Sequence, residues 1–175
     1  MIFAGVDPGG RHVAACLLRR RAPHHSLVSA LSFDVEAART VDHLRAAVAR
    51  VVAYVEPGAV ACGVETIHDV HGSPRMGTAY AQGLASCSLL AGRLAQALEG
   101  GFLEVRTPSR EEVRRALCGS PSADDATVKR VVMARISGWP KVSNCHERDA
   151  ALVALWTAET WAREALARRA ARDPR

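Results

Sequence analysis

Apolar residues in the first part of the chain follow the spacing of short strands. Residues 2–7 form an apolar run that ends in an Asp-Pro-Gly-Gly turn. Residues 12–19 and 27–34 are two further runs rich in apolar side chains, and the turn between them contains the pair His24-His25, which we expect to be solvated. Runs of this length between turn residues predict strands. We therefore expect a three-stranded antiparallel meander.

Helical spacing begins after the meander. Residues 40–55 carry apolar side chains three or four positions apart, and a Pro-Gly pair then stops the pattern. Residues 59–64 are a continuous apolar run, which is typical of a buried strand. Residues 66–77 have no period and contain Gly and Pro, so we expect a loop. A helix of small residues to about residue 99 and a short strand at 102–105 follow.

Three more helix starts are marked by an N-cap residue with an acidic residue three positions later. They are Ser109-x-x-Glu112, Ser122-x-x-Asp125 and Asn144-x-x-Glu147. Three antiparallel strands joined by a helix to a fourth, parallel strand is the element order of the ribonuclease H-like fold. We predict a single α/β domain over residues 1–175, with a central mixed five-stranded sheet flanked by helices and a basic tail at about 163–175.

Composition narrows the class of protein. The 175 residues are 49% hydrophobic and 23% charged, which excludes a disordered chain and is enough for a real core. No apolar run reaches the length of a membrane span, and no basic region precedes the first apolar run, so we expect neither a transmembrane helix nor a secretory signal. The five cysteines form no CxxC pair and predict reduced thiols. The net charge of +5 permits nucleic-acid binding without demonstrating it.

Three carboxylates lie in line with buried apolar stretches. Asp7 ends the first run, Glu65 directly follows the run at 59–64, and Asp149 begins an apolar stripe on the last helix. A carboxylate on a buried face is costly unless it is paired or binds a metal. Asp7 alone has an ordinary explanation as a turn residue, and Glu65 alone as a strand-end salt bridge. The fold order, however, places all three side by side.

His146 lies three residues before Asp149, so both side chains share one face of the first helical turn. A lone histidine here is more often a cap or a surface residue. Together with the two strand-end carboxylates, the pair predicts a site for Mg²⁺ or Mn²⁺. Two such ions about 3.5–4 Å apart activate water and stabilise the leaving oxygen of a phosphodiester. His68 and His71 lie in a loop without a cysteine partner and do not predict a zinc site.

These motifs resemble those of RuvC-type Holliday-junction resolvases through most of the chain. GVDPGG at 5–10 is similar to the opening motif of that family, GVET at 63–66 to its second acidic strand end, and HERDAALVALW at 146–156 to its closing motif. The resemblance implies a catalytic and metal-binding set of Asp7, Glu65, His146 and Asp149. It further implies an endodeoxyribonuclease that resolves four-way DNA junctions by paired nicks, leaving 5′-phosphate and 3′-hydroxyl ends.

The resemblance also implies contacts with DNA and partners. In the family, a loop side chain beyond the second acid enters the junction crossover; His68 takes that position here, and Arg75 is the nearest cation. Asp125 stands where the family tends to have a basic residue, so we expect Lys129 or Arg130 to supply that charge.

A homodimer through the helix at 77–99 would bring two sites to the two-fold junction. A branch-migration helicase is left open as a further partner, no membrane is expected, and the location implied is cytoplasmic and nucleoid-associated.

Other functions remain open. Another ribonuclease H-like nuclease, acting on RNA–DNA hybrids or branched DNA, would use the same carboxylates. A non-catalytic DNA-binding protein on this fold would not need Asp7, Glu65 and Asp149, and their presence argues against it. An actin-like kinase or ATPase also begins with strand-Asp-x-Gly, but needs two such domains around a nucleotide, and 175 residues argue against that reading.

Overall fold

The computed structural model describes residues 1–9, 11–21, 24–35, 41–66, 78–100 and 104–172. Most element boundaries predicted from the sequence are confirmed within a few residues. In chain order the elements are β1 (Ile2–Pro8), β2 (His12–Arg21), β3 (His24–Asp34), α1 (Val41–Val55), β4 (Ala59–Val64), α2 (Thr78–Glu99), β5 (Glu104–Arg106), α3 (Arg110–Cys118), α4 (Asp125–Arg135), β6 (Ile136–Ser137) and α5 (Cys145–Arg172).

The strands form one mixed sheet in the order β5-β4-β1-β2-β3-β6. β1, β2 and β3 make the expected antiparallel meander, while β4 pairs in parallel with β1 and β5 in parallel with β4. The predicted α/β, ribonuclease H-like arrangement is confirmed. Among the described residues the sheet has six strands rather than five, because the two-residue β6 pairs with the start of β3.

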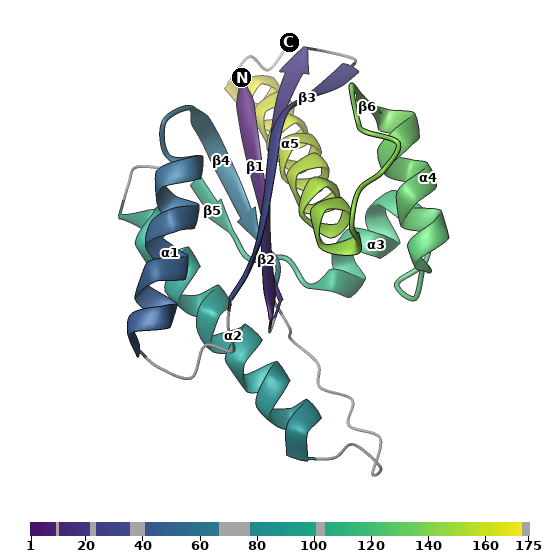
Figure 1. Ribbon diagram of the computed structural model, residues 1–175. Helices are drawn as coiled ribbons and strands as arrows, with labels where there is room; N and C mark the ends of the chain where they lie inside the picture. Colours follow the sequence, from purple (N-terminus) through teal and green to yellow (C-terminus); the bar gives the residue numbers. More distant parts are fainter. Residues whose placement is uncertain (10, 22–23, 36–40, 67–77, 101–103, 173–175) are drawn as a thin grey trace.

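Helices cover both faces of the sheet, with α1 and α2 on one face and α3, α4 and α5 on the other (Figure 1). Alternate side chains of β1 and β2 therefore enter two different cores. Val6 and Val13 pack with α1 and α2, whereas Ala14 and Leu18 pack with α4 and α5. Burial on both faces explains why the first strands read as continuous apolar runs.

Glycines let α5 lie unusually close to the centre of the sheet. Gly5 and Gly63 are register partners on β1 and β4. A Cβ at Gly5 would lie 2.2 Å from both the Ala150 carbonyl oxygen and the Ala154 amide nitrogen, and a Cβ at Gly63 would lie 2.3 Å from Thr157 Oγ1. Only a residue without a side chain fits there. The first half of α5 is thereby set directly against β1 and β4.

Two local features differ from the sequence predictions. Asp124, not Ser122, caps α4, and its side chain accepts a hydrogen bond from the Thr127 amide (2.8 Å). His25 is buried rather than solvated, because it pairs with Ile136 of β6. Burial, followed by the charges of neighbouring basic groups, lowers the pKa of His25 to about 4.

The other two predicted N-caps are confirmed, and they explain where α3 and α5 begin. The Ser109 side chain accepts a hydrogen bond from the Glu112 amide at 3.1 Å, and the Asn144 side chain accepts one from the Glu147 amide at 2.8 Å.

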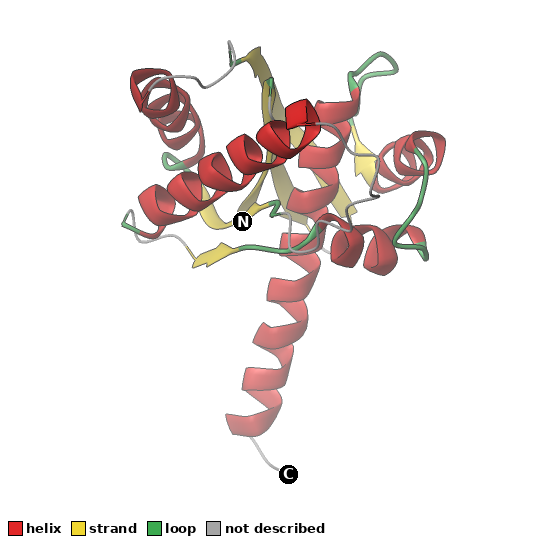
Figure 2. Ribbon diagram, turned by 90° about the horizontal axis from the view of Figure 1, so that it is seen from below, coloured by secondary structure: helices red, strands yellow, loops and turns green. Residues whose placement is uncertain are grey.

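The last turns of α5 extend away from the sheet and carry exposed arginines of the basic tail (Figure 2). No helix within the described ranges has the length and apolar character needed to span a membrane.

Candidate active site

Asp7 and Glu65 lie side by side at one end of the sheet. β1 and β4 are parallel neighbours, so their carboxyl ends meet at the same edge, and Val6 is the register partner of Val64. The Glu65 amide extends the ladder by donating to the Val6 carbonyl (2.9 Å). Each carboxylate residue is only 9% exposed. Because of this pairing, the two strand-end acids are neighbours, as the sequence predicts.

The first turn of α5 brings His146 to the same place. His146 Nδ1 donates a hydrogen bond to Asp7 Oδ2 at 2.8 Å. The start of the helix is tied to β3, since Asn144 donates to Ser32 Oγ (3.0 Å) and Ser32 donates to Glu147 (2.8 Å). These contacts fix the position from which His146 reaches Asp7.

Asp149 lies one turn further along α5, almost completely buried, and is hydrogen-bonded to two arginines of α3. Arg114 donates to Asp149 Oδ1 at 3.0 Å and Arg110 donates to Asp149 Oδ2 at 3.1 Å. Arg110 Nε also lies 4.0 Å from Glu65 Oε1. The structure therefore joins Asp7 with His146 directly, and Asp149 with Glu65 through Arg110.

Burial and the charge of neighbouring acids disfavour ionisation of Glu65 and Asp7. Burial, and then the charges of Asp7 and Asp149, raise the pKa of Glu65 to about 8. Burial also raises the pKa of Asp7, against the opposing effect of the hydrogen bond with His146. That same hydrogen bond raises the pKa of His146. The concentration of negative charge is what a bound cation would relieve.

The chemistry of the donors fits a hard divalent cation. Three buried carboxylates and one imidazole converge from two strand ends and one helix, and carboxylate oxygens are the ligands that Mg²⁺ and Mn²⁺ prefer. In the neutral imidazole that carries its proton on Nδ1, toward Asp7, the other ring nitrogen of His146 has a lone pair for a metal. Within the described part of the chain, however, no three acidic, histidine or cysteine groups lie close enough together to hold an ion as they stand. The Asp149 carboxylate is occupied by Arg110 and Arg114 instead.

Of the four residues expected to contact DNA, the structure describes two. Lys129 and Arg130 are exposed on α4 and border a shallow hollow on that helix. His68 and Arg75 lie outside the described residues. Asp125, the acid in an expected basic position, forms an ion pair with Arg148. Its charge is therefore balanced from α5, beside the candidate site.

Sequence reasoning missed three arginines that shape the site: Arg110, Arg114 and Arg148. The segment around α3 reads as an exposed charged helix, and nothing in the spacing separates Arg114 from the exposed Arg115. The only available signal was the apolar Val113, which is buried and fixes which face of α3 meets α5. Arg148 precedes Asp149 directly and is 7% exposed, donating to the Ser143 carbonyl as well as to Asp125.

The fold is shared with proteins whose structures have been solved. RuvC of Thermus thermophilus superposes with a TM-score of 0.71 at 20% identity, covering 94% of this chain and 97% of that one. A second structure shows the same T. thermophilus protein in complex with a Holliday junction substrate, at the same TM-score and identity. The fowlpox virus Holliday junction resolvase superposes with a TM-score of 0.52 at 12% identity, covering 92% and 97% of the two chains.

Sequence comparison gives no further relatives. No protein-family model matches the chain, and no curated protein sequence matches it. The similarity to resolvases is therefore one of structure, over nearly the full length of both chains.

Proposed function

We propose that this chain is a divalent-metal-dependent endonuclease that resolves four-way DNA junctions by paired nicks with 5′-phosphate and 3′-hydroxyl ends. The proposal is supported by two contacts at one end of the sheet: Asp7 is hydrogen-bonded to His146, and Arg110 contacts both Glu65 and Asp149. It is supported by a fold shared with resolvases, one of which has been solved with a Holliday junction substrate.

In this proposal the four residues hold Mg²⁺ or Mn²⁺, two ions per site, and the metal when bound supplies activation of water and stabilisation of the leaving oxygen. His146 orients the Asp7 carboxylate through its 2.8 Å hydrogen bond. Arg114, itself only 11% exposed in its side chain, holds Asp149 in a fixed position. Burial of the acids keeps water from screening their charge, which strengthens their attraction for a cation.

Contacts with the DNA backbone are assigned to exposed basic residues. Lys129 and Arg130 lie on α4, which packs against α5, and both are available to phosphates. His68 and Arg75 are proposed to act at the junction crossover, as the resemblance to resolvases implies. Such contacts position the substrate, and each phosphate contact makes binding more sensitive to salt.

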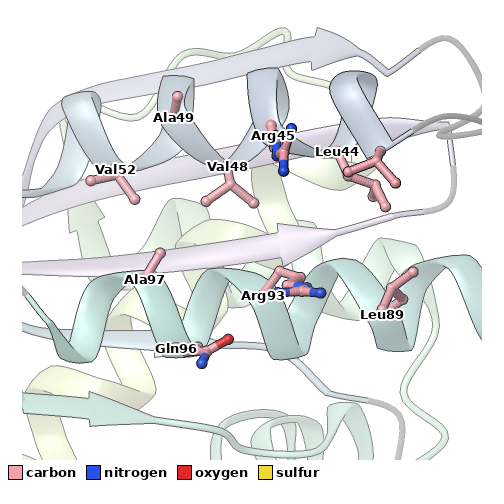
Figure 3. A pocket seen from close by; sticks show the side chains of 10 residues that line it. Leu44, Arg45, Val48, Ala49, Val52, Leu89, Arg93, Gln96 and Ala97 are labelled. Atoms are coloured by element: carbon pink, nitrogen blue, oxygen red, sulfur yellow. The ribbon is translucent and has the colours of Figure 1, made fainter.

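A homodimer is part of the same proposal. α1 and α2 pack side by side and leave an apolar groove of about 560 Å³ (Figure 3). Leu89 in this groove is 50% exposed although it is a large apolar residue. A second copy is the occupant we propose, because paired nicks on a two-fold junction need two sites. A light-scattering mass of about twice 18.7 kDa supports the dimer, and a mass of 18.7 kDa at micromolar concentration with and without junction DNA excludes it.

The test of the function compares substrates. Purified protein is incubated with a four-way junction, a linear duplex of the same sequence and an RNA–DNA hybrid, each in Mg²⁺, Mn²⁺ or EDTA. We expect symmetric nicks in the junction with either metal, little cutting of the duplex, and none in EDTA. Preferential cutting of the hybrid would contradict the resolvase function and indicate a ribonuclease H-like nuclease that acts on RNA–DNA hybrids. Tight junction binding without cutting in any metal would indicate a non-catalytic DNA-binding protein.

A further inference from the structure

Arg110 occupies the position between two proposed metal ligands. Its side chain is 51% exposed, donates to Asp149 Oδ2 at 3.1 Å, and places Nε 4.0 Å from Glu65 Oε1. The guanidinium is thereby the counter-ion of Asp149 and also lies beside Glu65. A divalent cation that takes Glu65 and Asp149 as ligands therefore has to displace it.

The neighbouring Arg114 is held much more firmly. Its side chain is 11% exposed, and it donates to the Ala123 carbonyl as well as to Asp149 Oδ1. Within the described residues Arg110 makes no comparable hydrogen bond to a backbone carbonyl, and it is the first residue of α3, with a half-exposed side chain. Of the two cations on Asp149, Arg110 is the one that can leave.

We propose that Arg110 exchanges partners during the reaction. In the free protein it is the counter-ion of Asp149 and lies beside Glu65; when a cation holds both residues, Arg110 is released and binds a backbone phosphate of the substrate strand. This inference rests on the proposed function, since it assumes a metal and a nucleic-acid substrate at this site. Arg110 then links the two ligands, because each favours the state in which the other binds.

Metal binding alone tests the first half of the exchange. Mn²⁺ is titrated into metal-free protein without DNA and followed by calorimetry and by the electron paramagnetic resonance of free Mn²⁺. Arg110→Ala is expected to bind Mn²⁺ about tenfold more tightly than the wild type, because the competing ion pair is lost and a half-exposed pair competes only modestly. Arg110→Lys, which keeps the charge without the fork, should lie between the two.

Arg115→Ala is the matched control. It removes the same charge from the same helix, but Arg115 is exposed and makes none of the contacts with Asp149 or Glu65. Its Mn²⁺ affinity should stay within about twofold of the wild type. Thermal unfolding verifies that the variants fold. Equal affinity of Arg110→Ala and Arg115→Ala, or weaker binding by Arg110→Ala, would overturn the exchange.

Salt dependence of DNA binding tests the second half. Junction affinity is measured against salt in EDTA and in Ca²⁺, with gels run to confirm that the DNA stays intact. In Ca²⁺ the slope of log affinity against log salt should be smaller in magnitude for Arg110→Ala by about 0.9, the value of one phosphate contact. In EDTA the two slopes should agree, since Arg110 is then held by the carboxylates. A slope difference of equal size in both conditions, or in neither, would contradict release by the metal.

The two proposals fail in different ways. The Mn²⁺ titration needs neither DNA nor catalysis, so tighter binding by Arg110→Ala would stand even if no junction were cut. Conversely, junction cleavage with unchanged Mn²⁺ affinity in Arg110→Ala would support the nuclease and remove the exchange.

Discussion

Gly5→Ala tests whether the close approach of α5 to the sheet builds the site. The added Cβ would lie 2.2 Å from backbone atoms of Ala150 and Ala154, whereas ordinary contacts begin at 3.4 Å. Backbone cannot rotate away as a side chain does, so α5 has to move by about 1 Å or the strand has to bend. Overpacking of this kind costs about 3 kcal/mol, at the upper end of the usual range. For a chain of this length, that cost lowers Tm by roughly 6–12 °C.

Thermal unfolding followed by circular dichroism measures this effect. Gly92→Ala is the matched control: Gly92 lies within α2, and a Cβ there meets nothing within 4 Å. Because alanine is favoured over glycine inside a helix by about 1 kcal/mol, this variant should gain about 2–4 °C in Tm. Gly5→Ala should also lose junction cleavage in whatever fraction remains folded, since Asp149 moves with α5. A Tm for Gly5→Ala within 1 °C of the wild type would refute the packing argument.

Three further outcomes are expected. Arg114→Met should destabilise the fold by about 3 kcal/mol in urea unfolding, because it leaves the buried Asp149 with only the half-exposed Arg110; unchanged stability would mean that the Arg114 pair contributes nothing. In EDTA, stability should fall as pH rises from about 4.5 to about 8, since the folded protein retains a proton on Glu65 that the unfolded chain releases; Glu65→Gln should flatten this slope, and an unaltered slope would exclude Glu65 as its source. His146→Asp should shift the ratio of cleavage rates from Mn²⁺ toward Mg²⁺, because imidazole suits Mn²⁺ better than Mg²⁺; a constant ratio would place His146 outside the metal ligands.

The sequence was informative where burial and element ends coincide. Asp7 and Glu65 were predictable because each follows an apolar run, and parallel strands bring their carboxyl ends to one edge. His146 and Asp149 were predictable from helical spacing. The placement of α5 was not, because the reason for Gly5 and Gly63 is a contact with a helix about 90 or more residues later, and a glycine inside a strand has several readings.

The arginines of the site were missed for a related reason. α3 carries Arg110, Arg114 and Arg115 among acidic residues, and the local sequence pattern alone does not indicate which of the three is buried. Packing of Val113 against α5 selects Arg114 for burial and leaves Arg115 exposed. The sixth strand and the burial of His25 also depend on a long-range pairing, here between residues 25–26 and 136–137. Two-residue strands carry no periodicity from which they could be predicted.

Cleavage and binding by Asp7→Asn measured side by side test the central claim most directly. The substitution keeps the shape of the side chain and removes one proposed ligand charge. The control for lost charge is Asp42→Asn on α1, since Asp42 is an exposed acid that forms an ion pair with Arg45. We predict that Asp7→Asn binds the four-way junction at least as tightly as the wild type, since less negative charge faces the phosphates, yet makes no cuts in Mg²⁺ or Mn²⁺. The control should cut normally. Cleavage by Asp7→Asn at the wild-type rate would contradict the assignment of the active site.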